Sequence, residues 1–269
     1  MLAIKNNIMA TNAARHLSQS YDSLAKSVER LSSGQRINSA KDDAAGLAVR
    51  ELMRADIAVI QQGTRNAQDG VSMLQTMEGA MGTIDSALVR MKQLAEQAAT
   101  GSYSAAQRSI MNSEFGEMAN EIERIATSTS FNGIKMLDNS ATVTVHFGGT
   151  NDYIDITGSK MTKAGLGVSS VSIASATSAT AALATLDSAI STKDTARAKF
   201  GYKMNRLEST VEVLNIQSEN LSTSESRVSD VDVATEMAAM TRNQVLAQAG
   251  VAMLAQANTT PQMALTLLR

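Results

Sequence analysis

The sequence predicts a mainly α-helical fold, in which long helices form an elongated antiparallel bundle or coiled coil with a small β-hairpin region and paired N- and C-terminal helices. Only 1 of the 269 residues is proline, so long uninterrupted helices are allowed almost everywhere. Apolar residues recur at alternating spacings of three and four, which is the heptad pattern of packed helices. Aromatic residues make up 3% of the chain, so aliphatic residues, alanine and 16 methionines must fill the core.

The N-terminal segment, residues 1–33, is predicted to be one amphipathic helix. Its seam has heptad spacing and consists of Ala14, Leu17, Tyr21, Leu24, Val28 and Leu31. Ile4 and Ile8 extend the apolar face upstream, and Gly34 follows the last periodic residue, as at many helix C-termini. Residues 34–43 are polar and aperiodic, which predicts a connector.

Residues 44–140 are predicted to contain two helices separated by a turn at residues 100–102. The first helix has two apolar stripes, so it must pack against two partners or one broad groove. One stripe is interrupted by Glu78 and Asp85, and its apolar members are Ala67, Val71, Leu74, Met81 and Leu88. The other stripe is uninterrupted and consists of Met73, Met77, Ala80, Ile84, Ala87, Met91, Leu94 and Ala98.

The period changes in the middle of the chain, at residues 141–180. Two alternating segments, 142–147 and 153–157, flank a Gly-Gly turn and predict a β-hairpin. The rest of this region is rich in Ser, Thr, Ala and Gly, so we expect it to be irregular.

The C-terminal part repeats the N-terminal pattern in reverse order. Residues 181–222 predict a long helix with polar exceptions in its seam at Lys193, Arg197 and Ser218, and residues 223–229 predict a second connector. The apolar members of that seam are Leu183, Leu186, Ile190, Phe200, Met204, Leu207, Val211, Leu214 and Leu221. Residues 230–269 predict a final helix with the apolar residues Val233, Met237, Met240, Val251, Leu254, Leu265 and Leu268. One intramolecular pair leaves much of each terminal helix uncovered, so we expect the apolar residues of both terminal helices to pack against other copies of the chain.

Composition and motifs argue against several classes of function. The chain has no cysteine, its two histidines, His16 and His146, lie far apart, and no paired acid and base or known catalytic motif is present. We therefore expect no enzyme, no cofactor and no metal. The net charge of −2 gives no reason to expect nucleic acid, and no run of 18 apolar residues predicts a membrane span. Because the N-terminus lacks a cleavable signal, we expect a cytoplasmic protein or one exported by another route.

Five charged residues cluster around the first connector: Arg30, Arg36, Lys41, Asp42 and Asp43. Two interpretations remain open for them. They are either a solvated loop or a set of salt links that fixes the register between neighbouring subunits, since interfacial charges confer specificity more than affinity.

Several runs of residues resemble the bacterial flagellin family. The longest match is residues 27–46, SVERLSSGQRINSAKDDAAG, followed by RNAQDGVS at 65–72 and TSFNG at 129–133. In the C-terminal half the matches are ENL at 219–221, SRVSDVD at 226–232, QAG at 248–250 and LAQAN at 254–258. The resemblance covers about residues 1–140 and 180–269. The short middle implies a flagellin with little or no outer variable domain.

The resemblance implies a D0-like layer made of residues 1–33 and 230–269 and a D1-like layer made of 44–140 and 181–222. It implies a secreted subunit of the extracellular filament, exported by the flagellar type III apparatus. The partners it implies are copies of the same chain, an export chaperone at the C-terminal segment, and the filament cap and junction proteins. Arg90, Leu94 and Glu114 match positions of a patch through which a host Toll-like receptor detects some flagellins.

Two structural alternatives compete with a filament subunit. One is a hook–filament junction protein, which shares the terminal helices, and the other is a secreted coiled-coil adaptor or translocator. A membrane-surface protein is disfavoured, because neither terminal helix combines a basic face with bulky aromatic residues.

Overall fold

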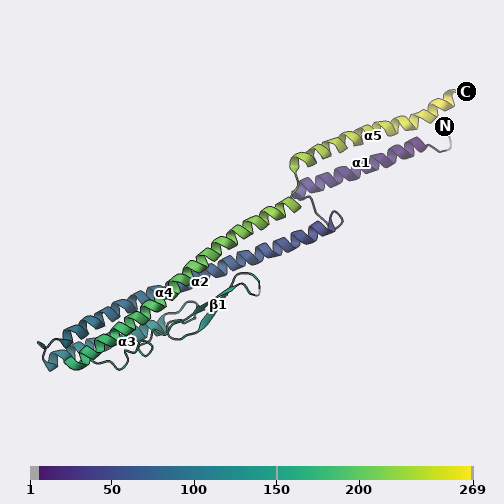
Figure 1. Ribbon diagram of the computed structural model, residues 1–269. Helices are drawn as coiled ribbons and strands as arrows, with labels where there is room; N and C mark the ends of the chain where they lie inside the picture. Colours follow the sequence, from purple (N-terminus) through teal and green to yellow (C-terminus); the bar gives the residue numbers. More distant parts are fainter. Residues whose placement is uncertain (1–5, 150, 268–269) are drawn as a thin grey trace. The chain divides into compact units, whose positions relative to one another are not determined.

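The computed structural model describes residues 6–149 and 151–267, with side chains up to residue 260. It confirms a mainly α-helical fold with one small antiparallel sheet (Figure 1). In chain order the elements are α1 (Ile8–Ser33), α2 (Ala44–Ala99), α3 (Ala105–Ser128), β1 (Thr142–His146), β2 (Tyr153–Thr157), α4 (Ala176–Ser229) and α5 (Val233–Leu267). No helix in the described part of the chain is long and apolar enough to cross a membrane.

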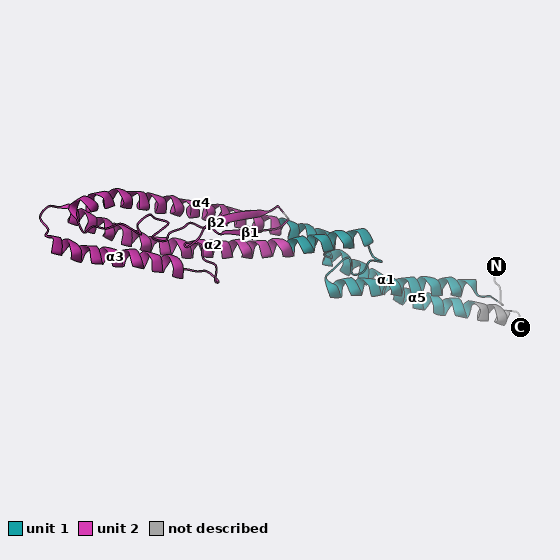
Figure 2. Cartoon of the chain, turned by 90° about the horizontal axis from the view of Figure 1, so that it is seen from below, with its two compact units in different colours: residues 1–57, 220–269 teal, residues 58–219 magenta. Residues whose placement is uncertain are grey.

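The chain divides into two compact units, of which one is discontinuous in sequence and the other is a single continuous segment (Figure 2). Unit 1 comprises residues 1–57 and 220–269, and unit 2 comprises residues 58–219. The boundaries fall inside α2 and α4 rather than at connectors. Residues 44–57 and 220–229 group with α1 and α5. Both segments contact the first connector, since Arg50 of α2 donates to the Ile37 carbonyl and the Val228 and Ser229 carbonyls of α4 accept from Arg36.

Unit 2 has a core formed by α2, α3, α4 and the hairpin. Both apolar stripes predicted for α2 are covered, since Leu74, Met77, Met81, Ile84, Leu88 and Met91 are all fully buried. Phe115 on α3 and Phe200 on α4 supply the largest buried rings. On the hairpin, Ile154 and Ile156 face the core while their neighbours face solvent, as strand alternation requires.

The hairpin is antiparallel, with Thr142 opposite Thr157 and His146 opposite Tyr153. It approaches α2 closely at Gly63. A Cβ atom added to Gly63 would lie 1.9 Å from the carbonyl oxygen of Phe147, so only glycine leaves room for this contact. One turn later, Asn66 Nδ2 donates to the His146 carbonyl at 3.0 Å.

The ends of the helices follow recognisable local rules. Gly34 has φ of 70° and terminates α1, as the sequence predicts. Ser104 and Gln107 form a reciprocal capping box at the start of α3. The Asp232 carboxylate accepts from the Ala234 amide at 3.0 Å and caps α5.

The predicted connector at residues 223–229 is wrong, because α4 is helical through Ser229. Polar composition did not end the helix. Ser224 donates to the carbonyl of Asn220 one turn back, and Glu225 pairs with Arg54 of α2 at 3.1 Å. The actual break is residues 230–232. The irregular region is also shorter than expected, since α4 begins at Ala176.

Candidate functional site

The candidate site is the surface of the paired helices α1 and α5. They run antiparallel, and a polar contact marks each end of the pair. Asn7 Nδ2 donates to the Ala257 carbonyl at 2.8 Å at one end. Arg30 Nη1 lies 3.5 Å from Glu236 Oε2 at the other. These contacts define the register of the two helices.

The seam between the helices is made largely of small side chains. The buried or half-buried residues of α1 are Ala10, Ala13, Leu17, Ser20, Leu24, Ser27, Arg30 and Leu31. Those of α5 are Glu236, Ala239, Met240, Asn243, Ala247, Gly250, Leu254, Ala257 and Thr260. A Cβ atom added to Gly250 would lie 3.0 Å from Leu17 Cδ1, which shows how closely the backbones approach.

The structure divides the predicted packing residues into two sets. Five of them are half-buried: Leu17, Leu24, Leu31, Met240 and Leu254. Five others are exposed: Ile8, Val28, Val233, Met237 and Val251. Ile4 and Leu268 lie outside the described residues, and the Leu265 side chain lies outside the described side chains.

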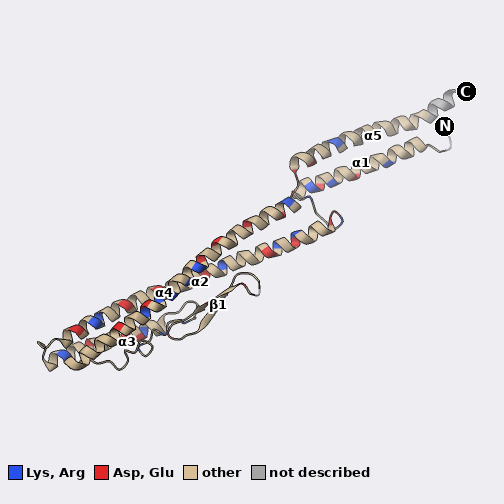
Figure 3. Ribbon diagram, in the orientation of Figure 1, with Lys and Arg blue, Asp and Glu red and all other residues tan. Residues whose placement is uncertain are grey.

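Other exposed apolar residues of α1 and α5 were not among the residues predicted to pack against other copies. They are Met9, Val245, Leu246 and Met253, and Tyr21 of the predicted seam joins them. Figure 3 shows how few charged residues α5 carries. Within Val233–Leu267 these are Glu236 and Arg242. A helix that is apolar on several sides is normally covered by protein, so this surface fits further helices better than water.

The connector charges mostly have partners within the chain. The Arg36 amide donates to the Ser229 carbonyl at 2.6 Å, and its guanidinium donates to the Val228 carbonyl at 2.9 Å. Asp43 Oδ1 accepts from the Gly46 amide at 2.9 Å at the start of α2. Lys41 is exposed. With Arg30 paired to Glu236, these charges hold the local fold of unit 1.

Asp42 attaches the connector to α1 through an ion pair with Lys26. Its carboxylate lies 2.8 Å from Lys26 Nζ and accepts from the hydroxyl and amide of Ser39. The hydrogen bond from Lys26 is the largest cause that lowers the pKa of Asp42 from 3.8 to about 2. The carboxylate therefore stays charged and ties the connector to α1.

Arg50 also holds the connector, and sequence patterning gave no signal of this role. The residue is 7% exposed, and its Nη1 donates to the Ile37 carbonyl at 2.9 Å and to Gln35 Oε1 at 3.0 Å. An arginine in a long helix normally faces solvent. Only the folded connector reveals that this one is enclosed.

The receptor-like patch is only partly assembled on the surface. Arg90 Nη2 on α2 lies 2.7 Å from Glu114 Oε1 on α3, and both side chains are exposed. Leu94 does not belong to this surface, because it is 2% exposed and packs in the core of unit 2. Its place in the uninterrupted α2 stripe accounts for this burial.

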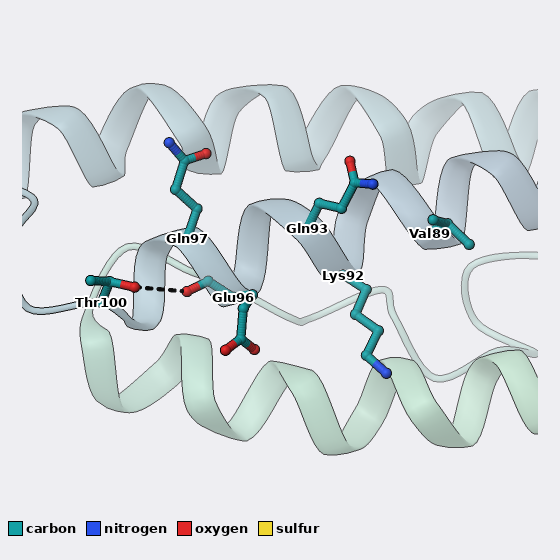
Figure 4. A pocket seen from close by; sticks show the side chains of 6 residues that line it. All are labelled: Val89, Lys92, Gln93, Glu96, Gln97 and Thr100. Atoms are coloured by element: carbon teal, nitrogen blue, oxygen red, sulfur yellow. Dashed lines mark hydrogen bonds between the residues drawn. The ribbon is translucent and has the colours of Figure 1, made fainter.

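An open groove of about 540 Å³ runs along the same part of α2 (Figure 4). Its lining residues are Val89, Lys92, Gln93, Glu96, Gln97 and Thr100. Thr100 donates to the Glu96 carbonyl, and Lys92 pairs with Asp187 at 2.5 Å. In the described part of the chain, no group of three or more His, Cys, Asp or Glu side chains could hold a metal ion.

Two family models match this chain over most of its length. The bacterial flagellin N-terminal helical region matches residues 4–142, and the bacterial flagellin C-terminal helical region matches residues 183–268. The chain belongs to the bacterial flagellin family. This flagellin is 40% identical to the flagellin of Halalkalibacterium halodurans, with all of both chains covered. It is 41% identical to the flagellar filament 33 kDa core protein of Treponema phagedenis, again with all of both chains covered.

The same family appears among solved structures. A crystal structure of Bacillus cereus flagellin superposes with a TM-score of 0.50 at 30% identity, covering 55% of this chain and 88% of that chain. The two relatives named above match this flagellin over its full length, whereas the solved structure matches about half of it.

Proposed function

We propose that this flagellin is a non-catalytic structural subunit that assembles with copies of itself into the helical extracellular filament of the bacterial flagellum, which serves motility. The observation that carries the proposal is the apolar surface of α1 and α5 that none of the described side chains of unit 1 covers. A contact between different patches on successive copies does not close on itself and generates a filament. We assign α1 and α5 to the D0-like layer of that filament.

Seeded growth followed by electron microscopy tests this function. We expect purified chain to elongate filament seeds above a critical concentration. Changing Val233 and Val251 to Asn should raise that concentration, because two exposed apolar contacts are lost. The control is Val213→Asn, which changes an exposed helical valine in unit 2. A native chain that stays monomeric at all concentrations would contradict the proposal.

We also propose that the subunit is exported by the flagellar type III apparatus and that an export chaperone covers α5 beforehand. Filament cap and junction proteins would then meet the same terminal helices. The long stretch of α5 without charged residues after Arg242 supports the proposal that a chaperone covers this helix before assembly. If a chaperone uses this surface, the Val233 and Val251 variant should co-purify with less of it than the Val213 variant.

Detection by a host Toll-like receptor is a separate proposal, supported by the exposed pair of Arg90 and Glu114. In a receptor-reporter cell assay, Arg90→Ala should weaken signalling. Lys92→Ala on the same helix is the matched control. Equal signalling by the Arg90 variant and the native chain would contradict the proposal that the receptor contacts Arg90 and Glu114.

A further inference from the structure

The methionines of this flagellin are unevenly exposed. Among the described side chains, three methionines are exposed, and all three lie on the paired terminal helices: Met9 is 69%, Met237 44% and Met253 63% exposed. The other described methionines are buried or half-buried. In the core of unit 2, Met77 and Met91 have no measurable exposure.

The exposed methionines lie on helices that expose other apolar side chains as well. Met237 lies one helical turn after the exposed Val233, Met9 follows the exposed Ile8 in sequence, and Met253 lies on the same helix as the exposed Leu246 and Val251. The three thioethers are therefore part of the surface proposed to contact other copies. The antiparallel register places Met9 and Met253 toward the end marked by Asn7 and Ala257.

We propose that these three methionines form an oxidation switch that blocks filament assembly. The inference rests on the proposed function. The chain contains no cysteine, so no thiol competes for a peroxide. A sulfur lone pair attacks one peroxide oxygen, the O–O bond breaks, an S–O bond forms, and the proton on the transferred oxygen passes to the departing hydroxide. The sulfur loses two electrons, and hydrogen peroxide is reduced to water.

The product is methionine sulfoxide, which replaces a flexible apolar side chain by a polar one and disrupts methionine-rich interfaces. A contact surface that must leave water on assembly then carries three polar groups without prepared partners. Assembly itself would protect the same thioethers by covering them. The switch therefore acts on free subunits and spares finished filaments.

The test exposes monomers and preformed filaments to hydrogen peroxide and assigns the added oxygen to each methionine by peptide mass spectrometry. Met1 and Met263 are followed in the same digest. In monomers we expect Met9, Met237 and Met253 to react well before Met77 and Met91, and in filaments we expect them to be protected. Oxidised monomers should show a critical concentration raised about tenfold or more, equivalent to about 1.4 kcal/mol of assembly free energy. Methionine sulfoxide reductases with a dithiol should restore growth.

Two triple variants make the assignment specific. Replacing Met9, Met237 and Met253 by Leu keeps apolar volume and should give growth that resists peroxide. The matched variant replaces the half-buried Met53, Met118 and Met204 by Leu and should remain sensitive. Equal sensitivity of the two variants, or normal growth of fully oxidised native chain, would overturn the inference alone. Failure of untreated native chain to form filaments would overturn the proposed function as well.

Discussion

Lys193 Nζ on α4 lies 2.5 Å from Asp85 Oδ1 on α2, so a polar exception in one seam faces a polar interruption in the other. One turn further along α4, Arg197 Nη2 lies 3.1 Å from Glu78 Oε1. A shift of one heptad would bring Lys193 to Lys92 in one direction and Arg197 to Val71 in the other. The observed antiparallel register of α2 and α4 is therefore favoured, because either shift leaves only one of the two pairs matched and one of them sets the enclosed Lys193 against Lys92.

Removing the charge of Lys193 should destabilise unit 2. For Lys193→Met we expect the free energy of unfolding to fall by about 1–3 kcal/mol, because the Asp85 carboxylate loses its charged partner. Asp85 keeps 36% exposure, so water limits the loss. Urea unfolding followed by circular dichroism measures the change. Lys92→Met is the control, since its pair with Asp187 is exposed and should change stability by less than about 0.5 kcal/mol.

Alkaline pH should cancel the same contribution. Burial lowers the pKa of Lys193, but hydrogen bonds from its ammonium to Asp194 and Asp85 outweigh burial and raise the pKa above 10.5. A raised folded-state pKa means that the stabilisation is complete below 10.5 and is lost as pH rises through the folded value. The difference in Tm between native chain and Lys193→Met should therefore shrink above pH 10.5. A constant difference up to pH 12 would count against the ion pair.

Acid should release the connector through Asp42. Its folded-state pKa is depressed to about 2, so its contribution to stability is present above 3.8 and is lost as pH falls toward 2. In Lys26→Met the largest cause of the depression is gone, and we expect the pKa of Asp42 to rise toward 3.8. Carboxyl-carbon NMR titration reads this value directly. In Lys41→Met, which keeps the contact between Lys26 and Asp42, the pKa should not move.

Gly63 should tolerate no side chain. We expect Gly63→Ala to destabilise unit 2 by about 1–3 kcal/mol, because its Cβ would collide with the Phe147 backbone and push the hairpin from α2. Gly79→Ala on the same helix has nothing within 4 Å and should be stabilising by about 0.5–1 kcal/mol. Urea unfolding of both variants provides the comparison. Equal effects would mean that the hairpin does not rest on Gly63.

Helical spacing predicted much of the helical part of the core of unit 2, whereas Met161, Leu166 and Ile173 are buried in the segment that we expected to be irregular. The α4 seam is correct at Leu186, Phe200, Leu207 and Leu214, all of which are buried. The same pattern could not say that Lys193 belongs inside, because its partner lies 108 positions away in sequence. Long-range pairing is visible only once the helices are placed together.

The terminal helices show where spacing alone reaches its limit. Leu17 faces α5, whereas Tyr21 and Val28 of the same predicted seam are exposed. Residues spaced alternately three and four positions apart lie in two neighbouring rows along one side of a helix. The spacing does not decide which of the two rows contacts the partner helix. Here the small residues of α5, such as Gly250, decide it by admitting Leu17. Likewise, Ser224 and Glu225 continue a helix that their polarity alone appeared to interrupt.

The many alanine, serine and glycine side chains in the seam between α1 and α5 limit what the two helices gain from each other. Beside Leu17, Leu24, Leu31, Met240 and Leu254, these small side chains remove little further hydrocarbon from water. We therefore expect the paired ends of the chain to gain much of their rigidity from the neighbouring copies that enclose them.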